Sequence, residues 1–325
     1  MMNQCKPGSA GIGERAHEVL TALNDGRRHQ GTELAQTLGI SRAAVWKHIE
    51  SLRSIGLDIE ADGKGYRLAR TIEWLNPESI RAGLVKRDLV PKVLFLTGST
   101  NACIRPEDGF PQVILAEGQS AGRGRRCRGW VSPPGRGIYL SLGWRFECAL
   151  TALAPLSLVA GIAVAHALKT LGVNSIGLKW PNDLIVNDRK LGGCLIDIQG
   201  TTDGPCHAVF GIGINVDLGA DQDIDQPWTD LHRLGVRVNR NNLAIELINS
   251  LIDHIENFEQ HGFEVLMARW QEMDELNGRK VRVLKPVGEP VEGQADGIDE
   301  QGRLRLLGND GPSLISSGEV SIRAV

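Results

Sequence analysis

The segment from Gly118 to Gly137 is the part of the chain whose residue types offer the most chemistry. It holds five arginines, six glycines and no acidic residue; the arginines are Arg123, Arg125, Arg126, Arg128 and Arg136. Glycine lets backbone N–H groups approach a ligand closely, and a guanidinium presents a planar fork of donors to carboxylate or phosphate. Because the like charges repel one another, we expect the loop to become ordered when an anion binds. A solvated loop or a nucleic-acid patch is the alternative.

A second segment whose residues could take part in chemistry is Lys179-Trp-Pro-Asn-Asp183, in which a lysine stands two positions before a proline. The fixed φ of Pro181 ends a β-type run and helps to hold Lys179 at a strand terminus. Lys179 is therefore a candidate cation of a functional site. An ordinary surface lysine at a strand end is the alternative.

The overall composition limits the classes of protein that these segments could serve. A chain of 325 residues has room for two or three domains, and its formal net charge of −3 argues against a surface that coats nucleic acid. The six cysteines lack CxxC spacing, so neither a zinc site nor a disulfide framework is predicted, and no metal ligands are assigned. The most apolar run, 153–171, contains polar interruptions and predicts a buried helix rather than a membrane span. Since the N-terminus shows no apolar signal core, we expect a cytoplasmic protein.

The first 70 residues have the pattern of a separate small domain. Apolar residues at 16, 19, 20 and 23 predict one amphipathic helix. A second short helix is expected from a Thr32 cap to Gly39, and a third follows a Ser41 cap. Alternating residues on both sides of Gly63-Lys-Gly65 predict a hairpin. Together these elements predict a winged helix-turn-helix over residues 1–70.

This domain offers candidate contacts to phosphates and base edges of DNA. Four lie on the third helix and one in the hairpin: Arg42, Lys47, His48, Arg53 and Lys64. Residues 1–75 contain ten basic and nine acidic residues, so one copy has little electrostatic attraction for DNA. Dimerisation is the expected source of affinity. A small docking domain without DNA binding is the alternative.

The remaining chain predicts two further domains after a linker at 71–77. In the central domain, 78–276, short β-type runs follow one another too closely for parallel crossovers, which favours a mixed or antiparallel sheet with helices. One of these helices, 243–258, is long and amphipathic. Short strands and turns over 277–325 predict a small SH3-like β-barrel. The expected fold class is α+β and multidomain.

The order of several short segments resembles that of the biotin–protein ligase family. These segments are Ser99-Thr-Asn101, the Gly-Arg loop at 122–128 that ends at Trp130, Lys179–Asp183, Lys190-Leu-Gly-Gly193 and Gly211-Ile-Gly-Ile-Asn215, with Gly318-Glu-Val-Ser-Ile-Arg323 near the C-terminus. No single motif is decisive, but their joint order spans essentially the whole chain. The winged helix makes the chain similar to the bifunctional form that also represses the biotin operon.

The resemblance implies a reaction in two steps. Biotin and MgATP give biotinoyl-5′-adenylate and pyrophosphate, and the biotinoyl group then passes to a lysine of a biotin carboxyl carrier protein. It further implies operator DNA and an adenylate-bound homodimer. One alternative is a ligase whose N-terminal domain does not bind DNA. Another is a non-enzymatic biotin-sensing regulator, against which the cationic residues argue.

The resemblance also implies roles for individual residues. The catalytic cations are Lys179, Arg123 and Arg125. The biotin-binding residues are Ser99, Thr100, Asn101, Gln119, Arg123, Gly124, Arg125 and Lys179. The residues for ATP or the adenylate are Arg125, Trp130, Asn182, Lys190, Asn215, Trp228, Glu319 and Arg323. For Asn215 a turn-fixing role is the alternative, and Asp183 is assigned either to metal or lysine orientation or to a turn.

Two residues of the Gly-Arg loop depart from the family pattern. Cys127 stands where the family more often has glycine, and Gly129 stands where it often has lysine. Arginines on both sides favour the thiolate of Cys127, which makes it a candidate reactive thiol, and an inert small residue is the alternative. For the predicted dimer, we expect the joining surface to be an exposed β edge around 191–198, next to the ligand site. By the same resemblance, Trp228 follows an acidic loop at 221–225 and matches a segment that folds over bound adenylate.

Overall fold

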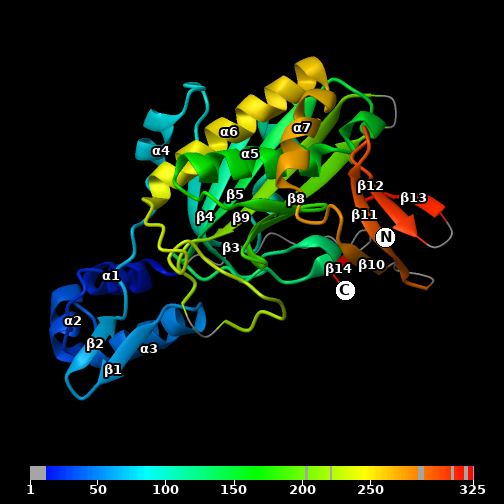
Figure 1. Cartoon of the computed structure of the whole chain (residues 1–325). Coiled ribbons are helices and arrows are strands. Elements are labelled where there is room, and N and C mark those ends of the chain that lie inside the picture. The colour runs from blue at the N-terminus through cyan, green and yellow to red at the C-terminus, as the bar shows by residue number, and fades with distance from the viewer. Residues whose placement is uncertain are drawn as a thin grey trace.

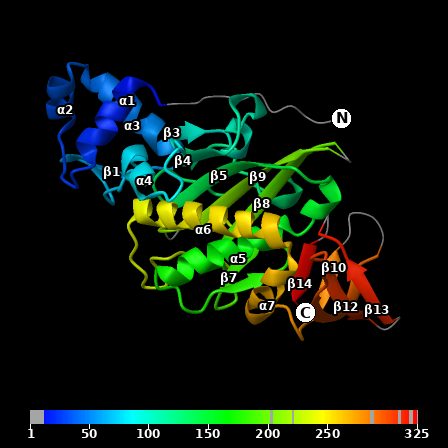
Figure 2. The same cartoon turned by 90° about the horizontal axis from the view of Figure 1, so that it is seen from above.

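The computed structural model describes residues 12–201, 204–219, 222–284, 289–308, 311–317 and 321–324. Three domains follow one another along the chain. The N-terminal and C-terminal domains lie at opposite ends of the central domain (Figures 1 and 2). The structure thus has the predicted α+β, multidomain fold class.

The N-terminal domain is the predicted winged helix-turn-helix. Its helices are α1 (Glu14–Leu23), α2 (Gly31–Leu38) and α3 (Arg42–Ser54), and its wing is the antiparallel pair β1 (Ile59–Asp62) and β2 (Gly65–Leu68). Apolar side chains from all three helices and the wing form a core of their own. The N-terminal domain therefore has a hydrophobic core separate from that of the rest of the chain.

The helix boundaries follow two of the three predicted caps. Ser41 caps α3, because its side chain accepts from the Ala44 N–H at 3.1 Å. Gly39 ends α2 with φ of 63°, a left-handed conformation that suits glycine. The prediction that Thr32 caps α2 is wrong, since the helix begins at Gly31 and its cap position is Gln30.

The predicted linker is fastened at both ends. Ile72 N–H donates to Asn24 Oδ1 at 2.7 Å, and Leu75 N–H donates to Glu117 Oε1 at 2.6 Å. The other oxygen of Glu117 meets Arg240 at 2.8 Å in a buried ion pair. Helix α4 (Pro77–Gly83) begins inside the predicted linker. The chain between the two domains is therefore tied to the central sheet next to Gly118 and Gln119.

The central domain contains a seven-stranded mixed sheet in the order β3-β4-β5-β9-β8-β7-β6. Its strands are β3 (Lys92–Thr97), β4 (Gln112–Gln119), β5 (Gly137–Phe146), β6 (Gly177–Lys179), β7 (Asp183–Val186), β8 (Arg189–Gly200) and β9 (Cys206–Asn215). Only β3 and β4 pair in parallel; the other neighbours are antiparallel. This matches the expected mixed or antiparallel sheet.

The sheet order corrects the prediction of an exposed edge over the whole of 191–198. Strand β8 lies between β7 and β9, and β7 pairs with its first part, from Arg189 to Gly193. Beyond Gly193, β9 alone pairs with β8 within the described part of the sheet. Cys194 N–H still donates to Asn182 O at 2.9 Å, so the open edge is the second half of β8 after Cys194.

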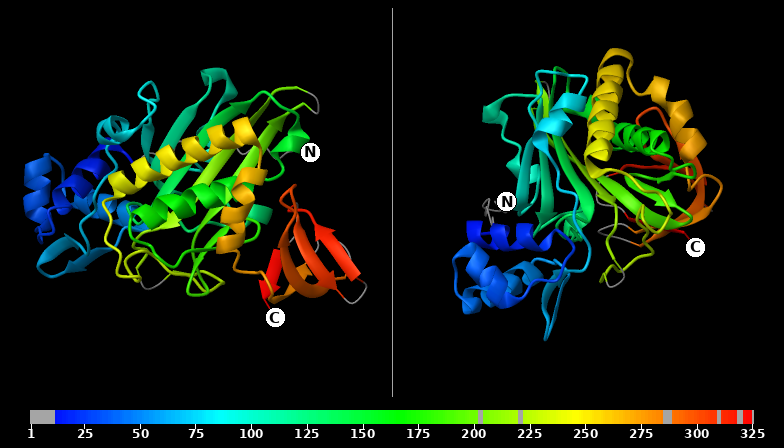
Figure 3. Two further views of the ribbon diagram at one scale, coloured as in Figure 1. Left: turned by 45° about the horizontal axis from the view of Figure 1, so that its top comes forward. Right: turned by 90° about the vertical axis from the view of Figure 1, so that its left-hand side faces the viewer.

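Three helices cover one face of this sheet: α5 (Leu156–Thr170), α6 (Arg240–His261) and α7 (Glu264–Met273). The right panel of Figure 3 shows them together on one side of the strands. The segment Leu150–Thr170 is long and apolar enough to cross a membrane, but most of it is buried in the protein. It is a buried core helix, as the sequence predicted.

The C-terminal domain is a small antiparallel β domain with the strand order β13-β12-β11-β10-β14. Its strands are β10 (Lys280–Leu284), β11 (Val291–Ile298), β12 (Leu304–Gly308), β13 (Gly311–Ile315) and β14 (Ser321–Ala324). The buried indole of Trp180 donates to Gly302 O at 2.9 Å. This bond fastens the domain directly beside Lys179 and Pro181.

Candidate functional site

A cavity of about 760 Å³ opens on the sheet where the predicted segments meet. Thirteen of the described residues predicted to bind biotin or nucleotide line it: Ser99, Thr100, Asn101, Gln119, Arg123, Gly124, Arg125, Trp130, Lys179, Asn182, Lys190, Asn215 and Trp228. They come from loops and strand ends separated by up to 129 positions in the sequence. The fold thus gathers one site from segments that are remote in the chain.

One end of the cavity is lined by neutral hydroxyl and amide groups. Gln119 Oε1 accepts the Thr100 N–H at 2.8 Å, and its Nε2 donates to Ser132 Oγ at 3.1 Å. Thr100 and Asn101 are both almost fully buried. This end presents hydrogen-bonding groups whose orientation is held by other protein groups.

Two glycines of β9 make room for side chains of the site. A Cβ atom at Gly211 would overlap the Asn101 amide, and one at Gly213 would lie 2.6 Å from the Trp130 ring. The Gly211-Ile-Gly-Ile-Asn215 motif therefore provides space as well as backbone. Asn215 at its end donates to Thr229 O at 3.0 Å, which supports the turn-fixing role, although the residue also lines the cavity.

The Gly-Arg loop closes on itself over the cavity. Gly124 N–H donates to Arg128 O at 2.7 Å, and Trp130 N–H donates to Gly122 O at 2.9 Å. The amide of Gly124 is thus used inside the loop. Arg126 and Cys127 have φ of 56° and 55°, the left-handed region that favours glycine.

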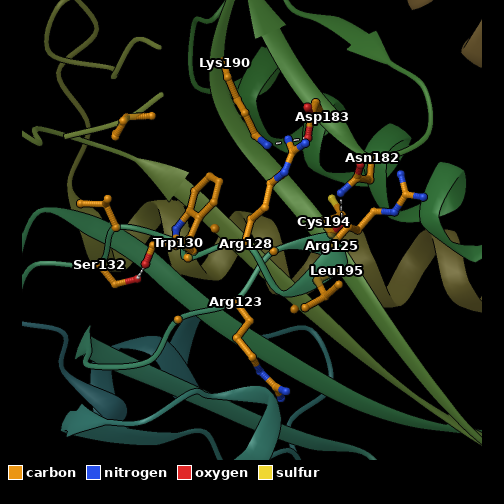
Figure 4. A pocket seen from close by; sticks show the side chains of 18 of the residues that line it. Arg123, Arg125, Arg128, Trp130, Ser132, Asn182, Asp183, Lys190, Cys194 and Leu195 are labelled. Carbon is orange, nitrogen blue, oxygen red and sulfur yellow. Dashed lines mark hydrogen bonds and ion pairs between the residues drawn. The ribbon is translucent and has the colours of Figure 1, made fainter. Parts of the chain in front are cut away.

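The loop arginines point in different directions. Figure 4 shows Arg128 and Lys190 directed toward Asp183, whereas Arg123 points away from them. Arg125 donates to the backbone oxygen of Ser317 from the C-terminal domain, and burial lowers the pKa of its guanidinium. The cationic charge is therefore spread around the cavity instead of being gathered at one point.

The other end of the cavity combines a tryptophan with charged groups. Lys190 Nζ lies 2.7 Å from Asp183 Oδ1 and 5.3 Å from the centre of the Trp130 ring, within the range of a cation–π contact. Asn182 Nδ2 donates to Cys194 O at 2.7 Å. Trp228 pairs with Lys190 through the backbone. Asp183 thus orients a lysine, one of the roles left open by the sequence.

Some predicted residues lie outside the described part of the chain. These include Glu319 and Asp221, and the side chain of Arg323, whose backbone belongs to β14. Ile322 of the same strand lines the cavity. The C-terminal domain therefore contributes at least one residue to the wall.

Sequence reasoning missed three polar residues of this region: Ser132, Ser141 and Asp197. Ser132 accepts from Gln119, while Ser141 and Asp197 hydrogen-bond with Asn101. No motif contains Ser141 or Asp197. Their signal was a polar residue inside an apolar β-type run, which calls for a buried hydrogen-bond partner.

The predicted DNA-contacting residues differ in how exposed their side chains are. Arg42, Lys47 and Lys64 are exposed, and Arg42 and Lys64 line a second hollow of about 440 Å³ between α2, α3 and the wing. His48 is half-buried. Arg53 has partners within the domain, because its Nε and Nη2 donate to Ile59 O at 2.9 and 2.6 Å and its Nη1 to Glu50 at 2.8 Å. Its guanidinium joins α3 to the wing.

Comparisons with known proteins agree with this architecture. The sequence matches the HTH domain over residues 15–67, the Biotin/lipoate A/B protein ligase family over 106–215 and the Biotin protein ligase C terminal domain over 277–323. A solved structure of a biotin protein ligase from Aquifex aeolicus, in complex with biotin and ATP, has a TM-score of 0.63 and 26% identity. The match covers 72% of this chain and 99% of the Aquifex aeolicus chain.

Two relatives extend over nearly the whole chain. Bifunctional ligase/repressor BirA of Escherichia coli (strain K12) is 39% identical over 317 residues, which are 94% of this chain and 97% of the relative. BirA of Bacillus subtilis (strain 168) is 30% identical over 90% of this chain and 93% of its own. The chain therefore belongs to the family of bifunctional biotin ligase/repressors, and its predicted class, a biotin–[acetyl-CoA-carboxylase] ligase with a DNA-binding repressor domain, is confirmed.

Proposed function

We propose that the cavity binds biotin at its neutral end and ATP at its charged end, joins them as biotinoyl-5′-adenylate, and transfers the biotinoyl group to a lysine of a biotin carboxyl carrier protein. One observation carries this proposal. Residues predicted for biotin and for ATP line one continuous cavity of about 760 Å³. A related ligase from Aquifex aeolicus has been solved with biotin and ATP, which supports the same pair of substrates here.

The neutral end suits the ureido ring of biotin. That ring carries N–H donors and a carbonyl acceptor but no charge, so fixed hydroxyl and amide groups can match it. Thr100 and Gln119 are held in place by hydrogen bonds within the protein. A preorganised neutral site needs little ordering when the ligand binds, which favours affinity.

The charged end suits the first chemical step. A biotin carboxylate oxygen attacks the α-phosphorus, the new phosphorus–oxygen bond forms, and the bond to pyrophosphate breaks. Two anions must approach, so fixed cations lower the barrier electrostatically. Lys179, Arg125 and Lys190 line the cavity and supply positive charge around this point. We assign Lys179 and Arg125 to the reacting groups, and Lys190 with Trp130 to the nucleotide.

Magnesium accompanies ATP as its counter-ion. The described wall of the cavity includes the carboxylates of Asp183, Asp223 and Asp225, and carboxylate oxygen is a ligand that Mg²⁺ prefers. Because Asp183 is already paired with Lys190, its carboxylate would be only partly available to coordinate the ion. When bound, the ion would neutralise phosphate charge.

In the second step the amine of the carrier lysine attacks the biotinoyl carbonyl, an amide forms, and AMP leaves with the electron pair of the broken anhydride bond. The lysine must reach the cavity from outside. The open half of β8, after Cys194, lies beside the cavity wall and offers unpaired backbone to an incoming strand. We place carrier docking there.

The test is transfer of biotin to a purified carrier domain in the presence of MgATP, with mass spectrometry to locate the modified lysine. One biotinylated lysine per carrier is expected, and omission of ATP should abolish the reaction. No transfer under saturating substrates would overturn the ligase half of the proposal.

For the repressor half, we propose that the adenylate-bound protein forms a homodimer through the same open edge of β8 and then binds operator DNA. Two copies double the phosphate contacts that one weakly charged domain offers. The carrier and the second copy would compete for this edge, so ligase and repressor states would exclude each other. We also propose that the protein is cytoplasmic.

Sedimentation and operator binding, each with and without the adenylate, test this half. Tighter dimers and stronger operator binding are expected together. If the adenylate changes neither, the regulatory half fails while the ligase half stands.

A further inference from the structure

A chain of polar groups leads from the open half of β8 to the neutral end of the cavity. Asn101 Nδ2 donates to Asp197 Oδ2 at 2.8 Å, and Asn101 Oδ1 accepts from Ser141 Oγ at 2.6 Å. Ser141 Oγ lies 2.7 Å from Thr100 Oγ1. Ser141 is fully buried, and Asp197 does not line the cavity. Neither can touch a ligand there, so each acts through its neighbour.

The identities of these atoms fix where each proton lies. A carboxylate oxygen only accepts, so Asp197 requires the NH₂ group of Asn101 to face it. Asn101 Oδ1 is then turned toward Ser141 and takes the single hydroxyl proton of that serine. The proton between the two hydroxyls must therefore come from Thr100.

The proton of Thr100 is thus used inside the protein. Its alternative acceptor, Gln119 Oε1 at 3.2 Å, also belongs to the protein and already accepts the Thr100 N–H. Only lone pairs of Thr100 Oγ1 are left for a ligand. The wall at Thr100 is consequently an acceptor and selects a donor.

From this arrangement we infer that Asp197 is a positioning residue that makes Thr100 an obligatory acceptor, so that the site selects a ureido N–H at that point. The inference rests on the proposed function of the cavity and adds the origin of its selectivity. Asp197 lies on β8 opposite Val209, outside every motif of the sequence. Gly211 makes the chain possible, because a side chain there would overlap the Asn101 amide.

Loss of the carboxylate would release this constraint. If Asn101 turned its NH₂ group toward Ser141, the serine would accept from it and donate to Thr100. The Thr100 proton would then keep only the longer 3.2 Å contact with Gln119 Oε1 as an alternative to pointing into the cavity, where it would oppose a ligand N–H. Unpaired or opposed polar groups in a buried site weaken binding strongly.

The experiment compares Asp197→Leu with Asp197→Asn in the full-length protein. Leucine removes the acceptor at similar volume, whereas the Oδ1 of an asparagine can still accept from Asn101. We expect the KM for biotin to rise roughly 10-fold or more in Asp197→Leu. The KM for ATP should be unchanged, and Asp197→Asn should retain most of the biotin affinity. Direct calorimetric titration with biotin provides a second readout.

A selectivity measurement separates this role from general support of the fold. Cyclic carbamate analogues of biotin, in which one ureido N–H is replaced by oxygen, lack the donor that Thr100 requires. The native protein should reject the analogue altered at the Thr100 side, and Asp197→Leu should discriminate less against it. Ser141→Ala breaks the same chain at its buried step. The double variant should therefore lose less than the product of the two single effects.

An unchanged biotin KM and unchanged discrimination in Asp197→Leu would overturn the inference. Equal losses for biotin and ATP would also overturn it, since they would assign Asp197 to the fold alone. A native protein that binds biotin but does not transfer it would instead overturn the proposed function. The two failures are thus distinguishable.

Discussion

The two ends of the cavity are built in opposite ways. The neutral end consists of short hydrogen bonds between residues on or next to strands, and Thr100, Asn101 and Ser141 are nearly or fully buried. The charged end depends on a loop with exposed arginines and two non-glycine residues at positive φ. Recognition of a neutral ligand needs donors and acceptors whose orientation is already fixed. Recognition of an anion can instead use charged side chains that become ordered when the ligand binds.

The largest effect is expected at the charged end, from Lys179→Ala. Removal of one charge that stabilises the transition state should lower the rate of adenylation roughly 10²- to 10³-fold. Single-turnover formation of the adenylate measures this step without the carrier. Lys169→Ala, at the exposed end of α5, is the matched control and should be fully active. An active Lys179→Ala would remove this lysine from the chemistry.

A pair of glycines two positions apart on β9 allows the two ends to be disturbed separately. Gly211→Ala should push the Asn101 amide and raise the KM for biotin, whereas Gly213→Ala should push Trp130 and raise the KM for ATP. A displacement of about 1 Å in a preorganised site can cost roughly 10²-fold. Each variant serves as the control for the other. If both variants impaired the same substrate, the division of the cavity into two ends would be wrong.

The difference between the ends also explains what the sequence could predict. Motif residues such as Thr100, Gln119 and Lys179 were found because chemistry and family resemblance mark short segments. Asp197 and Ser141 were missed because their meeting with Asn101 depends on how β5, β9 and β8 are placed side by side. Strand pairing is a long-range property that no local pattern contains.

Sheet order accounts for the correction of the predicted edge, and partners within the domain account for the position of Arg53. The 191–198 run looked like an edge because its own pattern says nothing about β7, which pairs with its first part. Arg53 was predicted to contact DNA because a basic side chain on a recognition helix favours contact with phosphates. Its position at the end of α3, beside Ile59 O, gives it a partner within the domain.

A smaller effect is expected on the dynamics of the Gly-Arg loop. Mutual repulsion of its arginines and the chain entropy of its glycines oppose closure in the free protein. Trypsin cleavage within the loop should therefore slow several-fold when biotin and ATP are added together. Cleavage elsewhere in the chain is the internal control. Equal loop cleavage in both states would show that the charged end is as preformed as the neutral one.

The smallest effect is expected from Cys127→Gly. The left-handed conformation of Cys127 costs about 1–2 kcal/mol for a residue with a side chain, and glycine avoids this cost. Glycine also loses more conformational entropy on folding, by roughly 0.5–1 kcal/mol, so the two effects largely offset each other. Thermal unfolding and biotin transfer should both stay near their original values, because the exposed thiol has no assigned part in the reaction. A marked loss of transfer with unchanged stability would instead give Cys127 a role at the charged end.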